Sequence, residues 1–213
     1  MKDIAIYGAG NFGREISCLI NIINKDKPQW NFLGFFDDTV EKGAQNEYGK
    51  ILGGIEDLNQ FIKPLSVVIA IASPKTVNKI VNGITNKLVD FPNIIAPNII
   101  YLDKTNLKIG RGNIICSSCL VSCNVNIGDF NIFNGFIPIG HDVVIGNFNS
   151  FMPSVNISGD VIIGNRNFFG VNSVILQKIE IGNETVIGAN SLIIRKTKDG
   201  MTYIGNPAKI VNY

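Results

Sequence analysis

The chain carries a single histidine, His141, in a position that allows acid–base chemistry. An imidazole titrates near neutral pH, so His141 is suited to take a proton from an amine or hydroxyl that attacks a carbonyl carbon. Asp142 can fix its tautomer if the chain bends locally, because neighbouring side chains of an extended segment point to opposite sides. Gly159 follows eighteen residues after His141, and its backbone can approach a reacting group closely. The alternative is an idle surface histidine.

A second candidate site is the glycine-rich turn Gly8-Ala9-Gly10-Asn11-Phe12-Gly13. It lies between a predicted strand and a predicted helix, where the N–H groups at the start of the helix favour a phosphate. Asp37 and Asp38 end the next predicted strand, where a dinucleotide site places an acidic residue on the ribose. The turn therefore predicts nucleotide binding, with NAD as one option. The alternative is a tight turn that only packs the helix on the strand.

The cysteines predict no metal site. Cys116, Cys119 and Cys123 have a spacing that suggests zinc, but no fourth Cys or His nearby completes a tetrahedral set. A zinc site of the carbonic-anhydrase kind needs three histidines, and the chain has one. We expect Cys119 to lie in the core, because it falls on a small inward position of the repeat described below.

Composition restricts the class of partner. The 213 residues are 46% hydrophobic and 17% charged, and the formal net charge is +2. No basic run indicates a nucleic-acid groove or a polybasic membrane patch, and no apolar run has the length of a membrane span. We therefore expect a cytoplasmic protein that binds small molecules, without nucleic acid and without membrane insertion.

The segment that must position His141 has a period of six. From Ile109 to Ile193 every sixth residue is bulky and apolar. A helix buries positions three and four apart and a strand buries every second one, so this period indicates a chain that turns the same corner every six residues. Gly110 begins a series of glycines at steps of eighteen, so three hexads make one coil and the fifteen hexads make five coils. The pattern predicts a hexapeptide β-helix.

Polar residues repeat at the same step of eighteen. The series is Asn113, Asn131, Asn149 and Asn167, with Thr185 at its end. We expect the asparagines to form a ladder of amide hydrogen bonds, and the glycines of the coils to take the backbone angles of the tight corners.

The first ninety-odd residues have a different rhythm. Apolar strand candidates alternate with segments of helical spacing: strands at 4–7, 32–36 and 66–72, helices at 11–23 and 74–88. Ser73 is a predicted helix cap. This order predicts a small α/β unit with a parallel sheet. Pro92 and Pro97 mark its exit, so we predict two domains, 1–95 and 96–213.

Several segments together resemble one protein family. These are YGAGNFGRE, FFDD, IAIAS, GHDVVIGNF and IGNPAKIV, in this order along the whole chain. The chain resembles the sialic-acid O-acetyltransferase and UDP-4-amino-sugar N-acetyltransferase family. The resemblance implies a Rossmann-like N-terminal domain that binds a nucleotide sugar, followed by a left-handed parallel β-helix. It also implies a homotrimer that binds acetyl-CoA between neighbouring β-helices.

The resemblance also assigns residues. It makes His141 the general base, Asp142 the residue that tunes it, and the Gly159 N–H a neighbour of the thioester oxygen. The positions that contact acetyl-CoA in the family are Ser150, Val171 and Ala189. The acceptor side comprises Gly10, Asn11, Phe12, Asp37, Asp38, Ala72 and Ser73. Ser150 is a departure, because relatives often carry a second histidine there.

The function expected from this resemblance is transfer of acetyl from acetyl-CoA to the amine of a nucleotide-linked (UDP-4-amino) sugar in surface-glycan biosynthesis. A sugar O-acetyltransferase of the sialic-acid type differs only in the acceptor. A non-catalytic trimeric scaffold that binds a nucleotide sugar is an alternative from another class. An NAD-dependent oxidoreductase is a third, but the β-helix supplies no recognisable hydride-transfer site.

Overall fold

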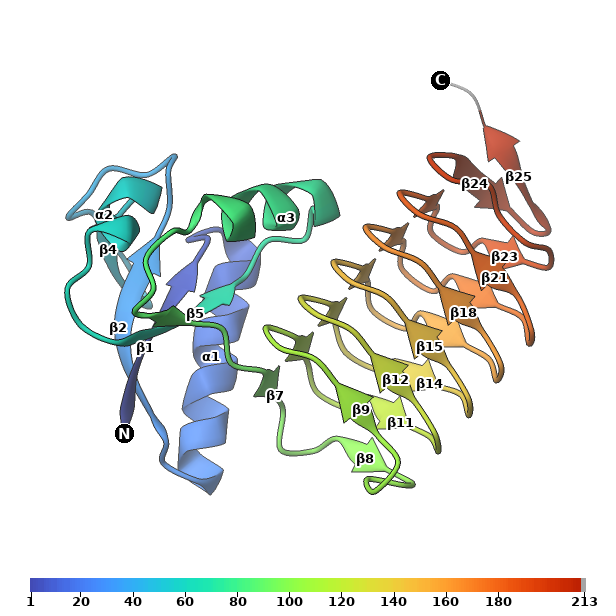
Figure 1. The fold of residues 1–213 in the computed structure, drawn as a ribbon, viewed down its shortest axis with the longest axis horizontal. Helices are drawn as coiled ribbons and strands as arrows, with labels where there is room; N and C mark the ends of the chain where they lie inside the picture. Colours follow the sequence, from blue (N-terminus) through green and yellow to red (C-terminus); the bar gives the residue numbers. More distant parts are fainter. Residues whose placement is uncertain (212–213) are drawn as a thin grey trace. The chain divides into compact units, whose positions relative to one another are not determined.

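The computed structural model describes residues 1–211, and the chain divides into two compact units, Met1–Pro97 and Asn98–Tyr213 (Figure 1). The predicted division between residues 95 and 96 lies close to this boundary. Among the described residues, no helix has the length and apolar content needed to cross a membrane.

The N-terminal unit is the predicted α/β fold. Its strands are β1 (Lys2–Tyr7), β2 (Trp30–Phe36), β3 (Gln45–Asn46), β4 (Gly49–Gly53), β5 (Leu65–Ile69) and β6 (Val89–Asp90). Its helices are α1 (Asn11–Asp26), α2 (Ile55–Asn59) and α3 (Pro74–Gly83). The sheet has the order β3-β4-β2-β1-β5-β6, and only the β3–β4 pair is antiparallel. The carboxyl ends of β1, β2, β4 and β5 therefore share one edge.

Helix α3 ends earlier than the predicted residue 88. The helix ends at Gly83, because the side chain of Asn59 binds the backbone of the next residues in a non-helical conformation. Asn59 Oδ1 accepts the N–H groups of Thr85 at 2.8 Å and Asn86 at 3.3 Å. This contact joins segments far apart in the sequence, so helical periodicity carries no sign of it.

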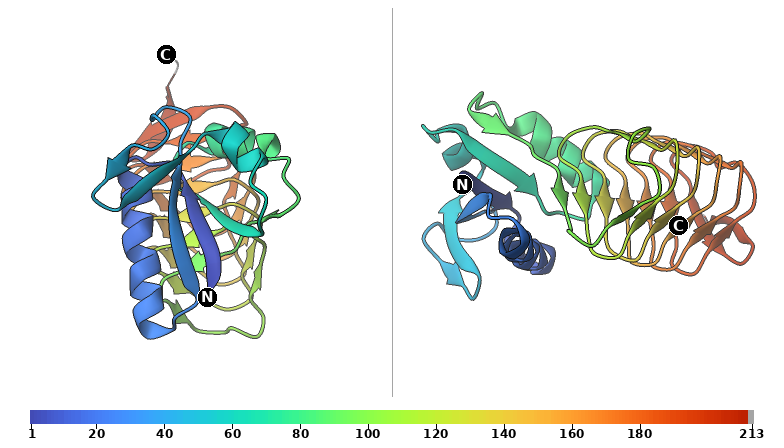
Figure 2. Two further views of the ribbon diagram at one scale, coloured as in Figure 1. Left: turned by 90° about the vertical axis from the view of Figure 1, so that its left-hand side faces the viewer. Right: turned by 90° about the horizontal axis from the view of Figure 1, so that it is seen from below.

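The C-terminal unit is a parallel β-solenoid made of very short strands (Figure 2). One face includes β10 (Ile114–Ile115), β13 (Ile132–Phe133), β16 (Ser150–Phe151), β19 (Phe168–Phe169), β22 (Val186–Ile187), β24 (Thr202–Gly205) and the antiparallel β25 (Ala208–Val211). The second face holds β8 (Ile100–Tyr101), β11 (Leu120–Val121), β14 (Pro138–Ile139), β17 (Asn156–Ile157), β20 (Val174–Ile175) and β23 (Leu192–Ile193). The third face holds β9 (Lys108–Ile109), β12 (Asn126–Ile127), β15 (Val144–Ile145), β18 (Ile162–Ile163) and β21 (Glu180–Ile181). Strand β7 (Ile94–Ile95) lies just before the boundary between the units.

The period of six is confirmed as the inward register. Each of the predicted positions ends a strand, and those from Ile115 to Ile193 are all buried. Phe133, Phe151 and Phe169 stack face to face in successive coils, with ring centroids 4.8 and 4.5 Å apart. Phenylalanine thus fills the same core position in three successive coils, and isoleucine takes that position in the coils on either side, at Ile115 and Ile187.

The prediction of five coils was too low. Before the regular repeat, β8 pairs with β11, and after it β24 pairs with β22. In these pairs Tyr101 lies opposite the inward residue Val121, and Tyr203 lies opposite the inward residue Ile187. Tyr101 lies 20 residues before Val121 and Tyr203 lies 16 residues after Ile187, in place of the regular step of 18, so a strict periodicity does not include them.

The asparagine ladder is confirmed. The Nδ2 group of Asn131 donates to Asn113 Oδ1 at 3.2 Å, Asn149 to Asn131 at 3.0 Å, and Asn167 to Asn149 at 3.0 Å. The backbone N–H of Thr185 closes the series on Asn167 Oδ1 at 2.7 Å. All these residues are buried, so the ladder satisfies polar groups that water does not reach.

The role predicted for the coil glycines was wrong. The left-handed corners are formed by non-glycine residues, at every sixth position from Ser118 to Asn190, with φ between 54° and 64°. The glycines are needed for space instead. A Cβ on Gly128 would lie 2.6 Å from the carbonyl oxygen of Gly146 in the next coil, a distance that no side chain tolerates.

Candidate functional site

His141 lies at the corner that follows β14, and its side chain is 47% exposed. Its Nδ1 atom is 2.8 Å from Oδ2 of Asp142. Asp142 has φ = +58°, and this left-handed conformation supplies the local bend that the pairing of two adjacent side chains requires. The structure therefore brings the predicted base and the predicted tuning carboxylate together.

The electrostatics of Asp142 suit that partnership. The hydrogen bonds from Asn124 and from His141 hold the pKa of Asp142 below its usual range, so it is an anion at neutral pH. An anionic carboxylate only accepts hydrogen bonds, so the neutral imidazole must carry its proton on Nδ1. That leaves the Nε2 lone pair free to accept a proton.

Gly159 lies directly against this lone pair. A Cβ on Gly159 would be 2.4 Å from His141 Nε2, so only glycine leaves room for the ring. Within residues 1–211 no acceptor contacts the Gly159 N–H. The imidazole of His141 and the backbone of Gly159 are thus neighbours, as the step of eighteen predicted.

Asp160 adds a second carboxylate at this corner. Within the described residues, ligating atoms of His141, Asp142 and Asp160 lie within 4.8 Å of one another. Gln177 Nε2 donates to Asp160 Oδ2 at 3.2 Å. These three side chains are the ones that could hold a cation, and they also make the surroundings of the base negative.

The predicted acetyl-CoA residues lie elsewhere on the solenoid. Ser150 is on β16 and is buried, with 1% exposure. Val171 and Ala189 follow β19 and β22, and both are exposed. Val171 and Ala189 lie at a corner that follows the face of β19 and β22, whereas His141 lies at a corner that follows the face of β14. Within one chain, the structure does not bring these residues to the base.

The glycine turn packs tightly and leaves one opening. A Cβ on Gly13 would be 1.9 Å from the carbonyl oxygen of Gly8, so α1 approaches β1 closely. A Cβ on Gly10, in contrast, would meet no heavy atom within 4 Å. Helix α1 begins at Asn11 with no side-chain cap, and Phe12 follows it in the first turn. The turn therefore has the packing role of the alternative interpretation and also an open backbone at Gly10.

Asp37 and Asp38 have structural partners that the sequence did not indicate. Asp37 accepts the N–H of Ala9 at 2.8 Å, which ties it to the glycine turn. Partial burial alone would raise the pKa of Asp37, but the hydrogen bonds from Ala9 and Thr39 outweigh it and hold the pKa low. Asp38 accepts the Tyr7 hydroxyl at 2.5 Å and the Ile55 N–H at 2.8 Å.

The last two predicted acceptor residues follow β5. Strand β5 ends at Ile69, earlier than predicted, so Ala72 and Ser73 lie in the loop before α3. Ser73 caps α3 as predicted, because its Oγ accepts the N–H of Thr76 at 3.4 Å. The loop shares the sheet edge with the glycine turn.

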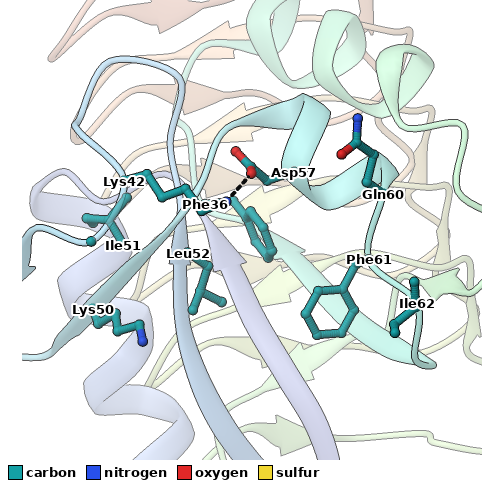
Figure 3. A pocket seen from close by; sticks show the side chains of 10 residues that line it. Phe36, Lys42, Lys50, Ile51, Leu52, Asp57, Gln60, Phe61 and Ile62 are labelled. Atoms are coloured by element: carbon teal, nitrogen blue, oxygen red, sulfur yellow. Dashed lines mark hydrogen bonds and ion pairs between the residues drawn. The ribbon is translucent and has the colours of Figure 1, made fainter.

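One pocket near this edge was missed by the sequence analysis. It has a volume of about 600 Å³ and lies beside β2, β4 and α2 (Figure 3). Phe36 and Phe61 form apolar walls, and Lys42 pairs with Asp57 at its rim. None of the predicted acceptor residues lines it. The short helix α2 builds one side, and no periodic pattern in the sequence had indicated this helix.

Comparisons with known proteins agree with this architecture. Residues 3–84 match the family model described as the PglD N-terminal domain. A search of curated proteins finds no significant sequence match.

Solved structures match the chain over nearly its full length. WeeI from Acinetobacter baumannii AYE is 26% identical with a TM-score of 0.88, and the match covers 99% of this chain and 100% of that one. The acetyltransferase domain of PglB from Neisseria gonorrhoeae FA1090 is 23% identical with a TM-score of 0.87, covering 99% and 100%. A perosamine N-acetyltransferase from Caulobacter crescentus is 20% identical with a TM-score of 0.85, covering 100% and 98%.

These findings confirm the family resemblance seen in the sequence. The N-terminal unit matches the PglD N-terminal domain, and the whole chain has the two-domain fold of the relatives. The chain therefore has the fold of these solved structures, an N-terminal α/β unit followed by a parallel β-solenoid.

Proposed function

We propose that the chain transfers acetyl from acetyl-CoA to the amine of a nucleotide-linked 4-amino sugar in the cytoplasm, in surface-glycan biosynthesis. The observation that carries this proposal is the corner at His141. An exposed imidazole has its Nδ1 atom on an anionic Asp142 and its Nε2 atom against Gly159. That arrangement suits proton removal from a nucleophile as it attacks a thioester.

In the proposed mechanism His141 Nε2 takes the proton as the sugar amine attacks the thioester carbon. A C–N bond forms, and the carbonyl oxygen gains the negative charge, which the Gly159 N–H stabilises. The C–S bond then breaks and the sulfur leaves with the electron pair. His141 returns its proton to that thiolate, so no acyl-enzyme forms and the base is regenerated.

The names of the relatives support the two substrates. The perosamine N-acetyltransferase was solved with CoA and GDP-perosamine, and the acetyltransferase domain of PglB with acetyl coenzyme A. For this chain we place the nucleotide sugar at the N-terminal unit. Gly10 offers open backbone just before α1, and Asn11 and Phe12 begin the helix, where an anion is favoured.

The other acceptor residues lie at the same sheet edge. Asp37 and Asp38 accept hydrogen bonds from backbone N–H groups. Their remaining lone pairs can accept hydrogen bonds from the ribose and the nucleobase of the bound substrate. Ala72 and Ser73 lie in the loop after β5. UDP is the nucleotide that the family resemblance indicates.

Acetyl-CoA is placed along the corner of Val171 and Ala189, with Ser150 close by in the sheet. Because this corner and the His141 corner follow different faces of one chain, the proposal requires that neighbouring copies of a homotrimer complete each site. No metal takes part in the proposed reaction.

Two alternatives keep the same fold. An O-acetyltransferase would use the same base on a sugar hydroxyl, and the scaffold hypothesis leaves His141 without a role. The carboxylates of Asp142 and Asp160 near the base favour the amine, because the attacking amine nitrogen carries a positive charge until His141 takes its proton, and the carboxylates stabilise that charge.

The test is thiol release from acetyl-CoA with UDP- and dTDP-linked 4-amino sugars and with free sialic acid. We expect turnover with an amino sugar, and a loss of about 100-fold or more in His141→Asn. Ser158→Ala, changed at the residue just before Gly159, serves as the control and should keep full activity. Turnover with sialic acid alone would change the acceptor to a hydroxyl. Full activity in His141→Asn would reject the proposed base.

A further inference from the structure

Asn124 lies one coil before Asp142, at the same position of the repeat. Both residues are corner residues with left-handed backbone, at φ = +56° and +58°. Because successive coils stack at the spacing of paired strands, about 4.8 Å, their side chains leave the corner side by side. Asn124 Nδ2 donates to Asp142 Oδ1 at 2.6 Å.

The two oxygens of Asp142 therefore have different partners. Oδ1 accepts from Asn124, and Oδ2 contacts Nδ1 of His141 at 2.8 Å. A carboxylate held at one oxygen cannot rotate freely about its side-chain bonds. Asn124 thus fixes the direction in which the other oxygen faces the imidazole, although Asn124 itself does not touch the ring.

The residue type at position 124 matters for the same reason. An amide offers the N–H donor that an anionic carboxylate needs. An aspartate there would oppose two negative charges at hydrogen-bond distance, which disfavours the ionised form of both. The Asn124 bond is also the largest of the effects that keep the pKa of Asp142 low.

We propose that Asn124 is a positioning residue for the acetyl transfer: it orients the Asp142 carboxylate so that His141 holds its proton on Nδ1 and presents Nε2 as the base. The inference rests on the proposed function. It predicts that removal of the amide releases Asp142 and lets the imidazole change tautomer.

The experiment uses the fact that His141 is the only histidine of the chain. In protein with 15N-labelled histidine, one imidazole gives all the ring signals, and its nitrogen shifts distinguish the two neutral tautomers. Asn124→Gly removes the amide and keeps a backbone that tolerates positive φ. Asn124→Asp keeps the shape and also tolerates this conformation, so it serves as a second variant.

In the wild type we expect the Nδ1–H tautomer at a pH where the ring is neutral. In Asn124→Gly the ring should shift towards Nε2–H, and kcat should fall about tenfold with the KM for acetyl-CoA unchanged. Asn124→Asp should show the same change or a larger one.

Arg166→Gly is the matched control. Arg166 also has left-handed backbone, at φ = 57°, and also contacts the next coil, through Glu184 at 2.7 Å. Loss of that contact should leave the tautomer and kcat unchanged. An equal loss of kcat in Arg166→Gly would mean that any broken contact between coils lowers activity, and would overturn the positioning role.

Two further outcomes separate this inference from the proposed function. An active wild type whose tautomer and kcat survive both Asn124 variants overturns the role of Asn124 and leaves the proposed function standing. Full activity in His141→Asn overturns the proposed base, and the positioning role falls with it, whatever the imidazole signals show.

Discussion

At His141 the conformation of the following residue matters most. An extended Asp142 would point away from the ring, but its positive φ turns the carboxylate back onto Nδ1. Aspartate adopts this conformation more readily than most residues, because its short polar side chain bonds locally. The repeat thus supplies a corner at which a base and its carboxylate can be neighbours in sequence.

The space beside the ring can be tested at Gly159. In Gly159→Ala the new Cβ would lie 2.4 Å from His141 Nε2, so the imidazole must move away. We expect kcat for acetyl transfer to fall about 100-fold, since a small misplacement of a catalytic group has that effect. Steady-state kinetics measures the fall, and circular dichroism checks that the fold is kept.

Gly10→Ala is a control for that substitution, used for the fold alone. A Cβ on Gly10 has open space around it, so the secondary structure and melting temperature of this variant should match the wild type. A Gly159→Ala enzyme with unchanged kcat would show that the ring position is not critical, and would weaken the assignment of His141 as the base.

At the scale of the element, one two-residue strand shows how the repeat separates inside from outside. In β15, Ile145 is 2% exposed and Val144 is 42% exposed. Ile145 lies between Ile127 and Ile163 of the adjacent coils. The two neighbours in sequence therefore have opposite environments.

This difference gives a stability prediction. Ile145→Asp places an unpaired carboxylate among apolar side chains and should lower the free energy of unfolding by about 4 kcal/mol or more. Val144→Asp, on the same strand, should change it by under about 1 kcal/mol. Urea unfolding followed by circular dichroism measures both. Equal effects in the two variants would contradict the inward register.

At the scale of the whole molecule, the proposed site is divided between two corners of the solenoid. His141 follows the face of β14, whereas Val171 and Ala189 follow the face of β19 and β22. In a homotrimer, the His141 corner of each copy would face the Val171 and Ala189 corner of its neighbour, which would complete three equivalent sites.

Complementation tests this arrangement. His141→Asn and Ala189→Trp should each be inactive alone, the second because the bulky ring obstructs acetyl-CoA. When the two variants are unfolded and refolded together, random trimers should regain about a quarter of the wild-type activity, because one interface in four then carries both intact corners. Mixtures that remain inactive while co-assembling would contradict a site shared between copies.

The sequence by itself determined the fold of both units and the candidate base. The period of six identified the inward residues, the step of eighteen placed Asn131 over Asn113 and Gly159 over His141, and the glycine turn marked the start of α1. These features are local or strictly periodic, so position in the chain fixes position in space.

Only the tertiary structure decided the contacts that periodicity does not encode. The outer coils at Tyr101 and Tyr203 break the spacing, and Asn59 ends α3 from a distant segment. The sequence also predicted the wrong residues for the corners. Stacking of the coils holds non-glycine residues in left-handed backbone, and the glycines are needed where successive coils approach closely. The contact of Asn124 also depends on the tertiary structure, since only the stacking of coils brings its amide to the carboxylate of Asp142, which faces His141.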